Sequence, residues 1–457
     1  MKQDPNSNFY LHGSLPLLFL KTAAPIVLVM LASGIHTLVD AWFLGRFVGA
    51  QALTAVTLMF PFFMLMVALS TLVSNGYASV VARLLGAGRM GEAQSTYLGA
   101  SLVALLIALT LIMTFLLVGT DMVQWLARGD AVLGNLGYSY IAPMIFGSFL
   151  MMTIGVNVDS LRCEGRMGFM TLVTLIGTLM NIPFNYLLIV EMDMGVPGSA
   201  YGTLLAQSCS LIAILIYRAL GQSSLGFRPA NGHPILKHWK EFLALGLPFS
   251  LSYVGVSLIA FLVLYDLQVW APENYEQSAA AYGIVTRLMT FSYMPILGLS
   301  LAFQAILGNN FGAGDIARSR KSFHLALMIA FAYCALLQIV YQGIPDHLAA
   351  IFVDDTAIIA ETARILPIMT FLFVLFGPQN MATTYFQAVG DAGRALALSV
   401  SRMYLLALPL IFGLPYLIGE PGIWIANPVT EILMMVVTTI VFISYWRKNR
   451  MAAAAAI

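Results

Sequence analysis

Long stretches without any charged side chain are the feature that most limits what this chain can fold into. No Asp, Glu, Lys or Arg occurs between Glu92 and Asp121, or between Lys321 and Asp346. Each stretch exceeds the roughly 20 apolar residues that a helix needs to cross the hydrocarbon of a bilayer. The runs are long and unbroken, which favours spanning helices over the short alternating segments of a β-barrel. With 60% hydrophobic and 9% charged residues, the chain is predicted to be an all-α integral membrane protein.

Charged residues, prolines and glycines divide the sequence into twelve expected transmembrane helices. Basic residues gather in alternate connections and acidic residues in the opposite ones. By the positive-inside rule, the basic connections and both termini of this multi-pass protein lie in the cytoplasm. The expected spans lie near 15–44, 52–82, 93–119, 135–161, 168–190, 197–219, 241–267, 278–309, 322–345, 361–388, 394–417 and 421–446.

Two glycine motifs that occur twice indicate an internal repeat. Leu85-Gly86-Ala87-Gly88 recurs as Phe311-Gly312-Ala313-Gly314, and the turn Gly165-x-x-Gly168 recurs as Gly390-x-x-Gly393, at almost the same separation along the chain. Six spans separate the copies, so the second copy has the same orientation as the first, as in the parallel repeats of transporters. We expect two pseudo-symmetric six-helix bundles, an N-lobe over 1–220 and a C-lobe over 241–457, joined by a basic cytoplasmic linker over 221–240.

Composition argues against several other classes of protein. The net charge of +1 gives no reason to expect a nucleic acid partner. Cys163, Cys209 and Cys334 form no spaced metal or redox motif, so we expect neither a disulfide nor a metal site nor a cofactor. An intramembrane enzyme would need a nucleophile with a base, or a cluster of metal ligands. We find neither, and the chain is not expected to be an enzyme.

Ionisable groups inside a bilayer are costly, so they are functional candidates by default. Asp40 is the strongest candidate, because it follows the apolar run 23–39, and His36 lies one helical turn before it on the same face. Two simpler interpretations stay open. The first span could end at Val39, which would make Asp40 an outer-surface carboxylate, and His36 could be a packing residue.

Three expected spans carry polar pairs at i, i+4 spacing, namely His36 with Asp40, Asn181 with Asn185, and Thr203 with Gln207. Each pair forms one polar stripe, which must face the bundle interior or a wet cavity. Desolvation there favours the protonated form of a carboxyl group, so such a group can carry a proton. The alternative is that these side chains only hold helices together by hydrogen bonds.

The remaining charged residues near spans are weaker candidates. Asp159 and Arg162 are three residues apart at a cytoplasmic helix end and are expected to pair. Arg287 and Arg402 could contact substrate or extend to an interface. Asp266 stands near the position in the second repeat that corresponds to Asp40, but it precedes an acidic connection. That placement favours the outer end of its span over a second ion site.

The order and spacing of several segments resemble the MATE (multidrug and toxic compound extrusion) family over nearly the whole chain. The resemblance implies two six-helix lobes in a V shape, alternating access, and export of cationic or amphipathic drugs in exchange for protons or sodium ions. It also implies a monomer in the bacterial plasma (inner) membrane. The segments that carry it are Val39-Asp40-Ala41-Trp42-Phe43-Leu44-Gly45, Arg162-Cys163-Glu164-Gly165-Arg166, Asn181-Ile182-Pro183-Phe184-Asn185 and Leu307-Gly308-Asn309-Asn310-Phe311-Gly312-Ala313-Gly314.

Within that family the chain looks most like the DinF-like branch, in which the coupling carboxylate belongs to the first helix, here Asp40. Similar members often carry a second carboxylate where this chain has Asn185, so the resemblance implies a site with one carboxylate. NorM-like members have acids in the seventh and tenth helices, whereas 247–263 and 368–387 contain none here. The family's supporting polar cluster maps onto Asn157, Asn181, Thr203 and Tyr140.

The sequence therefore predicts a secondary active multidrug exporter driven by protons through Asp40, with His36 and Gln207 facing the substrate cavity. A sodium-coupled antiporter is the first alternative. A flippase for a lipid-linked sugar is the second, and it would need a cluster of cationic side chains to hold a pyrophosphate. Arg287, Arg364 and Arg402 are the arginines available for that task.

Overall fold

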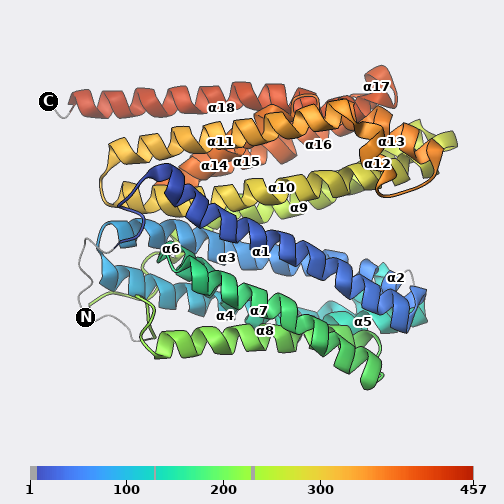
Figure 1. Ribbon diagram of the computed structural model, residues 1–457, viewed down its shortest axis with the longest axis horizontal. Coiled ribbons are helices and arrows are strands. Elements are labelled where there is room, and N and C mark those ends of the chain that lie inside the picture. The colour runs from blue at the N-terminus through green and yellow to red at the C-terminus, as the bar shows by residue number, and fades with distance from the viewer. Residues whose placement is uncertain (1–7, 128–129, 228–231, 456–457) are drawn as a thin grey trace. The chain divides into compact units, whose positions relative to one another are not determined.

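The computed structural model describes residues 8–127, 130–227 and 232–455, without the side chains of 35–38, 50, 446 and 448–455. Its regular structure within these ranges is helical (Figure 1). The chain forms two compact units. Unit 1 comprises Met1–Ser250, Gln304–Ser319 and Ala388–Gly390, and unit 2 comprises Leu251–Phe303, Arg320–Gln387 and Asp391–Ile457. Unit 1 thus includes the expected linker and the first turns of the expected C-lobe, whereas the lobe boundaries read from the sequence stay a prediction.

The first half of the chain supplies eight α-helices and two π-helical segments, Leu44–Val48 after α1 and Tyr186–Glu191 after α7. The α-helices are α1 (Leu15–Phe43), α2 (Ala50–Leu58), α3 (Phe60–Gly86), α4 (Met90–Leu126), α5 (Ala131–Phe146), α6 (Ser148–Cys163), α7 (Met167–Asn185) and α8 (Val196–Ala219).

The second half follows the same order with more interruptions. A 3-10 turn, Pro272–Asn274, precedes α10, and a π-helical segment, Ser401–Ala407, joins α15 to α16. The α-helices are α9 (Trp239–Trp270), α10 (Tyr275–Gly312), α11 (Ile316–Gly343), α12 (Pro345–Ala350), α13 (Thr356–Met369), α14 (Phe373–Val389), α15 (Ala392–Val400), α16 (Leu408–Gly413), α17 (Pro415–Ile418) and α18 (Pro421–Ala455).

The expected twelve spans are confirmed when each bent helix pair counts as one span. Among the described residues, ten helical stretches are long and apolar enough to cross a membrane, and two further pairs pass the same test together. The pairs are α5 with α6, bent by 47°, and α13 with α14, bent by 51°. One expected span differs, because 52–82 is broken at Met59 into α2 and α3.

The two bent pairs show that the sequence repeat is also a structural repeat. Asp130 and Asp355 occupy equivalent places in the two copies, and each caps the helix that follows by accepting hydrogen bonds from two backbone N–H groups. Pro143 and Pro367 lie in the last turn of α5 and of α13, just before each bend. Proline removes a backbone hydrogen bond and so permits such a bend. The same devices therefore shape corresponding spans in both halves.

The repeated glycine motifs end their helices in the same way. Gly88 after α3 and Gly314 after α10 adopt φ angles of 68° and 79°, a left-handed conformation that favours glycine. The residue after each glycine closes the helix end with a backbone hydrogen bond. The N–H of Arg89 donates to the carbonyl oxygen of Leu84 at 2.9 Å, and the N–H of Asp315 donates to that of Asn310 at 3.0 Å. This is the Schellman ending that makes glycine necessary after the last turn.

Within unit 1 the glycines of the two repeats also pack reciprocally. A Cβ at Gly86 would lie 1.9 Å from the carbonyl oxygen of Asn309, and a Cβ at Gly312 would lie 2.0 Å from that of Arg83. Asn309 and Gly312 are the repeat counterparts of Arg83 and Gly86, so the contact repeats itself about a local twofold axis. Only glycine allows the backbones of α3 and α10 to approach this closely.

This packing predicts that one added methyl group lowers the stability of the folded protein at Gly312 but not at Gly283. Gly312→Ala should destabilise the protein by about 1–3 kcal/mol, because the new Cβ overlaps the Arg83 carbonyl. Gly283→Ala on the same helix is the matched control, since a Cβ there meets nothing within 4 Å. Thermal unfolding of the purified variants in detergent measures the difference. Equal unfolding temperatures for both variants would contradict the close packing.

The charge pattern predicts the orientation of the spans. Single cysteines introduced at Lys237 and Arg450 in a cysteine-free background should be protected from a membrane-impermeant thiol reagent in intact cells. Cysteines at Asp130 and Glu276 should react with it. Labelling of the same variants after permeabilisation is the control, and labelling of position 450 in intact cells would contradict an even number of spans.

Candidate ion-coupling site

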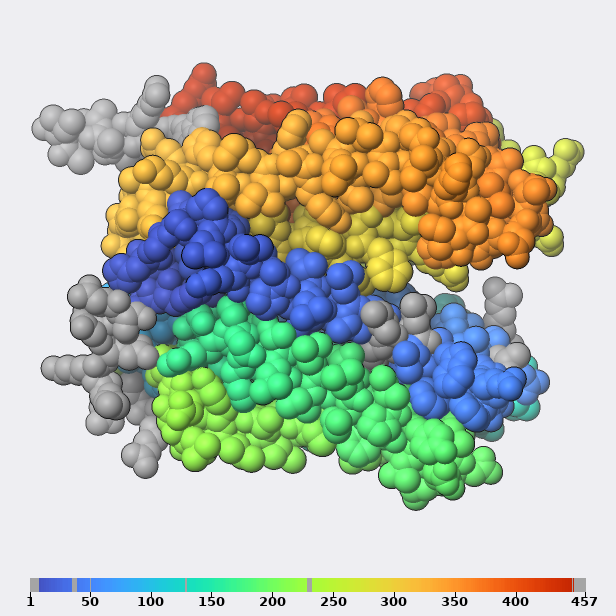
Figure 2. All heavy atoms as spheres, in the orientation of Figure 1, coloured from blue at the N-terminus to red at the C-terminus, as the bar shows by residue number. Residues whose placement is uncertain are grey.

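Asp40 and Asn185 both stand beside irregular helix ends. Asp40 lies three residues before the end of α1 and is half-buried, and a π-helical segment follows that helix. Asn185 is the last residue of α7 and is followed by a second π-helical segment. Helix α1 lies against α7, which lies against α8 (Figures 1 and 2). Single π-helical turns occur frequently at functional sites, because they widen the helix and shift its register.

A chain of hydrogen bonds joins these three helices through their polar side chains. The Nδ2 of Asn185 donates to the Oδ1 of Asp40 at 2.5 Å and to the Oδ1 of Asn181 at 2.9 Å. The Nδ2 of Asn181 in turn donates to the Thr203 hydroxyl at 3.1 Å. Asn181 and Asn185 are 1% and 0% exposed. The structure thus brings together four residues that the sequence placed on separate stripes.

Gly202 makes room for the side-chain amide of Asn185, which stands in the middle of these hydrogen bonds. A Cβ at Gly202 would lie 2.2 Å from the Oδ1 of Asn185, so a larger residue on α8 would displace the amide. That Oδ1 is buried and has no hydrogen-bond partner among the described residues. The site therefore offers a carboxyl group with a fixed N–H donor, and next to it an acceptor oxygen that a proton donor or a small cation can use.

The other expected site residues differ in how they relate to the hydrogen bonds that join Asp40, Asn185, Asn181 and Thr203. Tyr140 on α5 interacts electrostatically with Asp40 and packs against the apolar cluster of Leu44, Ala52 and Val196. Gln207 follows Thr203 by one turn on α8, and its buried Oε1 has no partner in the described part of the chain. The side chain of His36 lies outside the described residues, so its expected place in the substrate cavity stays a prediction.

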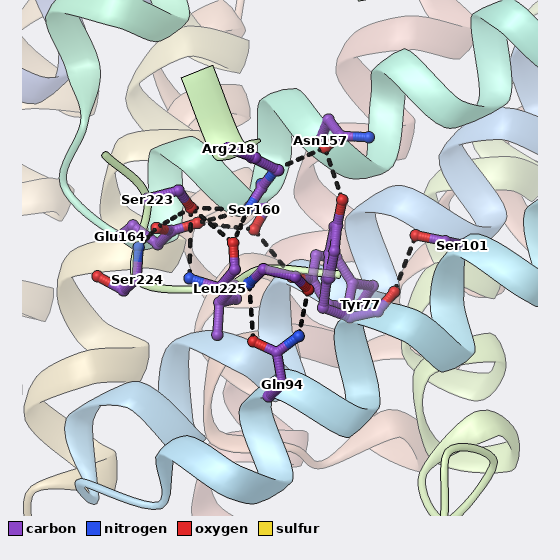
Figure 3. Close-up of polar contacts among 12 residues, drawn as sticks. Tyr77, Gln94, Ser101, Asn157, Ser160, Glu164, Arg218, Ser223, Ser224 and Leu225 are labelled. Atoms are coloured by element: carbon purple, nitrogen blue, oxygen red, sulfur yellow. Dashed lines mark hydrogen bonds and ion pairs between the residues drawn. The ribbon is translucent and has the colours of Figure 1, made fainter. Parts of the chain in front are cut away.

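Asn157 belongs to a different polar network, near the ends of α6 and α8 (Figure 3). Its Oδ1 accepts hydrogen bonds from the Tyr97 hydroxyl at 2.9 Å and from the Nε of Arg218 at 2.8 Å. The Arg218 guanidinium also lies 4.4 Å from the centre of the Tyr97 ring. None of the hydrogen bonds described for Asn157 reaches Asp40, so a role in ion coupling would have to be indirect.

The same network holds the start of the expected linker against unit 1. Arg218 and Glu164 have fully buried side chains and lie 3.4 Å apart. Arg218 Nη1 also donates to the Leu225 carbonyl at 2.6 Å, and Glu164 Oε2 accepts from the backbone N–H of Ser224 at 2.7 Å. A buried ion pair needs such extra hydrogen bonds to offset its desolvation. Residues just after α8 are therefore part of the packed unit.

Asp159 and Arg162 pair as expected, at 2.8 Å. Arg162 is only 1% exposed and also donates to the side chain of Gln304 at 3.1 Å. Arg287 is exposed on α10. Arg364 forms ion pairs with Glu361 and with Glu420.

Asp266 is buried, unlike the outer carboxylate that its place in the sequence suggested. It lies one turn before the end of α9, as expected, but is only 1% exposed. Its Oδ2 has no hydrogen-bond partner among the described residues. Its neighbours Val263 and Leu267 belong to the apolar core of unit 2, and Leu410 and Ile411, which stand at about the repeat separation from Asn185, pack in the same core. The amide that Asp40 contacts in unit 1 therefore has an apolar counterpart in unit 2.

Glu431 is a partly buried carboxylate that the sequence reasoning missed. It lies inside α18 and forms an ion pair with Arg402 at 2.6 Å. The signal was present, because Glu431 interrupts the otherwise apolar expected span 421–446 and an acidic residue inside a span calls for a partner. The sequence left open whether Arg402 contacts substrate or extends to an interface. In the structure, Arg402 is instead paired with Glu431 inside unit 2.

Comparisons with known proteins agree with this architecture. A probable multidrug resistance protein, YoeA, of Bacillus subtilis is 21% identical over 93% of both chains. The multidrug export protein MepA of Staphylococcus aureus is 24% identical over 87% of both. A crystal structure of MATE in the bent conformation superposes with a TM-score of 0.88 at 22% identity, and covers 98% of each chain. The MatE family model matches residues 25–187 and 267–412, well over half of the sequence, so the chain belongs to the MatE family.

Proposed function

We propose that this protein is a secondary active multidrug exporter of a bacterial plasma membrane. It exchanges cationic or amphipathic compounds for protons, and Asp40 is the residue that binds the exchanged proton. The observation that supports this most is the hydrogen-bond chain from Asp40 through Asn185 and Asn181 to Thr203. Relatives of similar length are named as a probable multidrug resistance protein and as a multidrug export protein, which supports the substrate class.

The geometry suggests how one proton could change the packing of α1. The ionised carboxylate of Asp40 accepts the N–H of Asn185, which ties the end of α1 to α7. When Asp40 takes up a proton, the charge that strengthens this hydrogen bond is lost. The hold on α1 then weakens, and the neighbouring π-helical segments can absorb a shift of the helix. Proton and drug are coupled if each favours a different one of these two arrangements.

Sodium coupling is the nearest alternative, and one feature favours it. The Oδ1 of Asn185 has no partner in the part of the protein that the structure describes, lies beside Asp40 and could serve as an oxygen ligand. Drug efflux from everted vesicles that carry either a pH gradient or a sodium gradient separates the two possibilities. Transport driven by the pH gradient alone is expected.

A lipid-linked sugar flippase fits less well. Such a protein needs free cationic side chains for a pyrophosphate, but Arg364 is neutralised by Glu361 and Glu420, and Arg402 by Glu431.

The central prediction concerns Asp40→Asn. Asn keeps the shape of a protonated Asp but cannot release a proton, so the variant should bind drug and fail to export it against a gradient. Drug efflux driven by a pH gradient, at matched protein levels, measures this. Asp266→Asn is the matched control, because Asp266 stands at the repeat-related position, and it should retain most of the transport. Wild-type export by Asp40→Asn would refute the mechanism.

Asn185→Asp should shift the pH optimum of transport upward. The new carboxyl group would lie within hydrogen-bonding distance of Asp40, and two carboxylates so close together hold one proton to higher pH. Deprotonation of the pair, which the cycle requires, would then need a more alkaline solution. The pH profile of drug efflux in vesicles measures the shift, with Thr203→Ser as a control that keeps the hydroxyl. An unchanged profile would place Asn185 outside the coupling site.

A further inference from the structure

Unit 2 contains an ion pair deep within a span that the proposed proton site does not use. Arg402 Nη1 lies 2.6 Å from Glu431 Oε1, and Arg402 Nη2 lies 3.1 Å from Oε2, so the pair is bidentate. Glu431 follows the start of α18 by ten residues, about 15 Å along the helix. The side chains are only 16% and 13% exposed. Charges at this depth are functional candidates by default.

One aromatic ring lies over the guanidinium, as rings lie over bound organic cations, and two more rings pack against that ring. The Arg402 guanidinium carbon lies 4.8 Å from the centre of the Phe376 ring. Phe376 stacks on Phe373 at 5.5 Å and meets the edge of Tyr293 at 5.8 Å. A ring face next to a carboxylate attracts a positive charge through both its quadrupole and the ionic partner.

A glutamine on α14 completes the shell around the pair. The Oε1 of Gln379 accepts from Arg402 Nη2 at 2.5 Å, and its Nε2 donates to the backbone carbonyl of Glu431 at 2.9 Å. Gln379 is only 3% exposed. The backbone that carries Glu431 is therefore held by a group other than Arg402, and Glu431 keeps its position when the guanidinium leaves.

We propose that Glu431 and the Phe376 ring form a binding site for organic monocations in unit 2, which the Arg402 guanidinium occupies as an internal ligand in this conformation. Arg402 belongs to the π-helical segment Ser401–Ala407, an irregular stretch of a kind that is frequent at functional sites. An aromatic cation that replaces it restores the charge balance at Glu431, so no carboxylate is left buried and unpaired. The proposal does not depend on Asp40.

Binding of tetraphenylphosphonium to the purified full-length protein in nanodiscs tests the site. Removing the internal competitor with Arg402→Gln should tighten binding several-fold. Glu431→Gln should weaken it at least tenfold. The double variant Arg402→Gln/Glu431→Gln buries no unpaired charge and should fold like the wild type, yet bind as weakly as Glu431→Gln.

The controls separate this site from other effects. Arg364→Gln removes a paired arginine elsewhere in unit 2 and should leave binding unchanged. Tetraphenylborate, an anion of the same shape, should not bind more tightly to Arg402→Gln. Asp40→Asn should bind tetraphenylphosphonium as the wild type does, so a failure of the proton mechanism would not affect this result. Unchanged or weaker cation binding by Arg402→Gln, or wild-type binding by the double variant, would overturn the proposal.

Discussion

The amide of Asn185 is the interaction on which the proposed coupling depends. A carboxyl group inside a spanning helix has no bulk water to solvate it, so its charge state is set by the few groups that touch it. Both N–H groups of Asn185 are engaged, one with Asp40 on α1 and one with Asn181 on its own helix. Asn181 is anchored to Thr203 on α8. In the proposed mechanism, a change of charge on Asp40 acts through these hydrogen bonds on the packing of three helices.

The two halves share a backbone plan but differ in the chemistry that they hold. Asp130 and Asp355 cap equivalent helices, and bent pairs occur at equivalent places. Asp40 meets an amide, whereas Asp266, its counterpart, is buried beside apolar residues. In unit 2 the charged chemistry instead involves Arg402 and Glu431. In the account proposed above, the repeat supplies a symmetric framework in which each half binds a different ion, a proton in one and an organic cation in the other.

The pattern of charges and glycine motifs was enough to predict the spans and the repeat, because hydrocarbon imposes strict rules on which residues a span can carry. The i, i+4 spacing also placed Asn181 and Asn185 on one stripe. It could not predict contacts between stripes. The family resemblance placed Asn157 and Asn181 in one polar cluster, yet Asn157 pairs with Arg218 near the ends of α6 and α8. The burial of Asp266 depends on how helices pack. Glu431 could have been found from its position alone, because it is an acid within an apolar span.

The central claim is that drug and proton compete through Asp40. The most direct measurement is proton release when rhodamine 6G binds to the purified protein in weakly buffered solution, followed with a pH indicator. The wild type should release protons as the dye binds, and the release should decline at alkaline pH, where Asp40 is already ionised. Asp40→Asn should bind the dye without releasing protons. Equal release from the wild type and from Asp40→Asn would show that another group carries the proton.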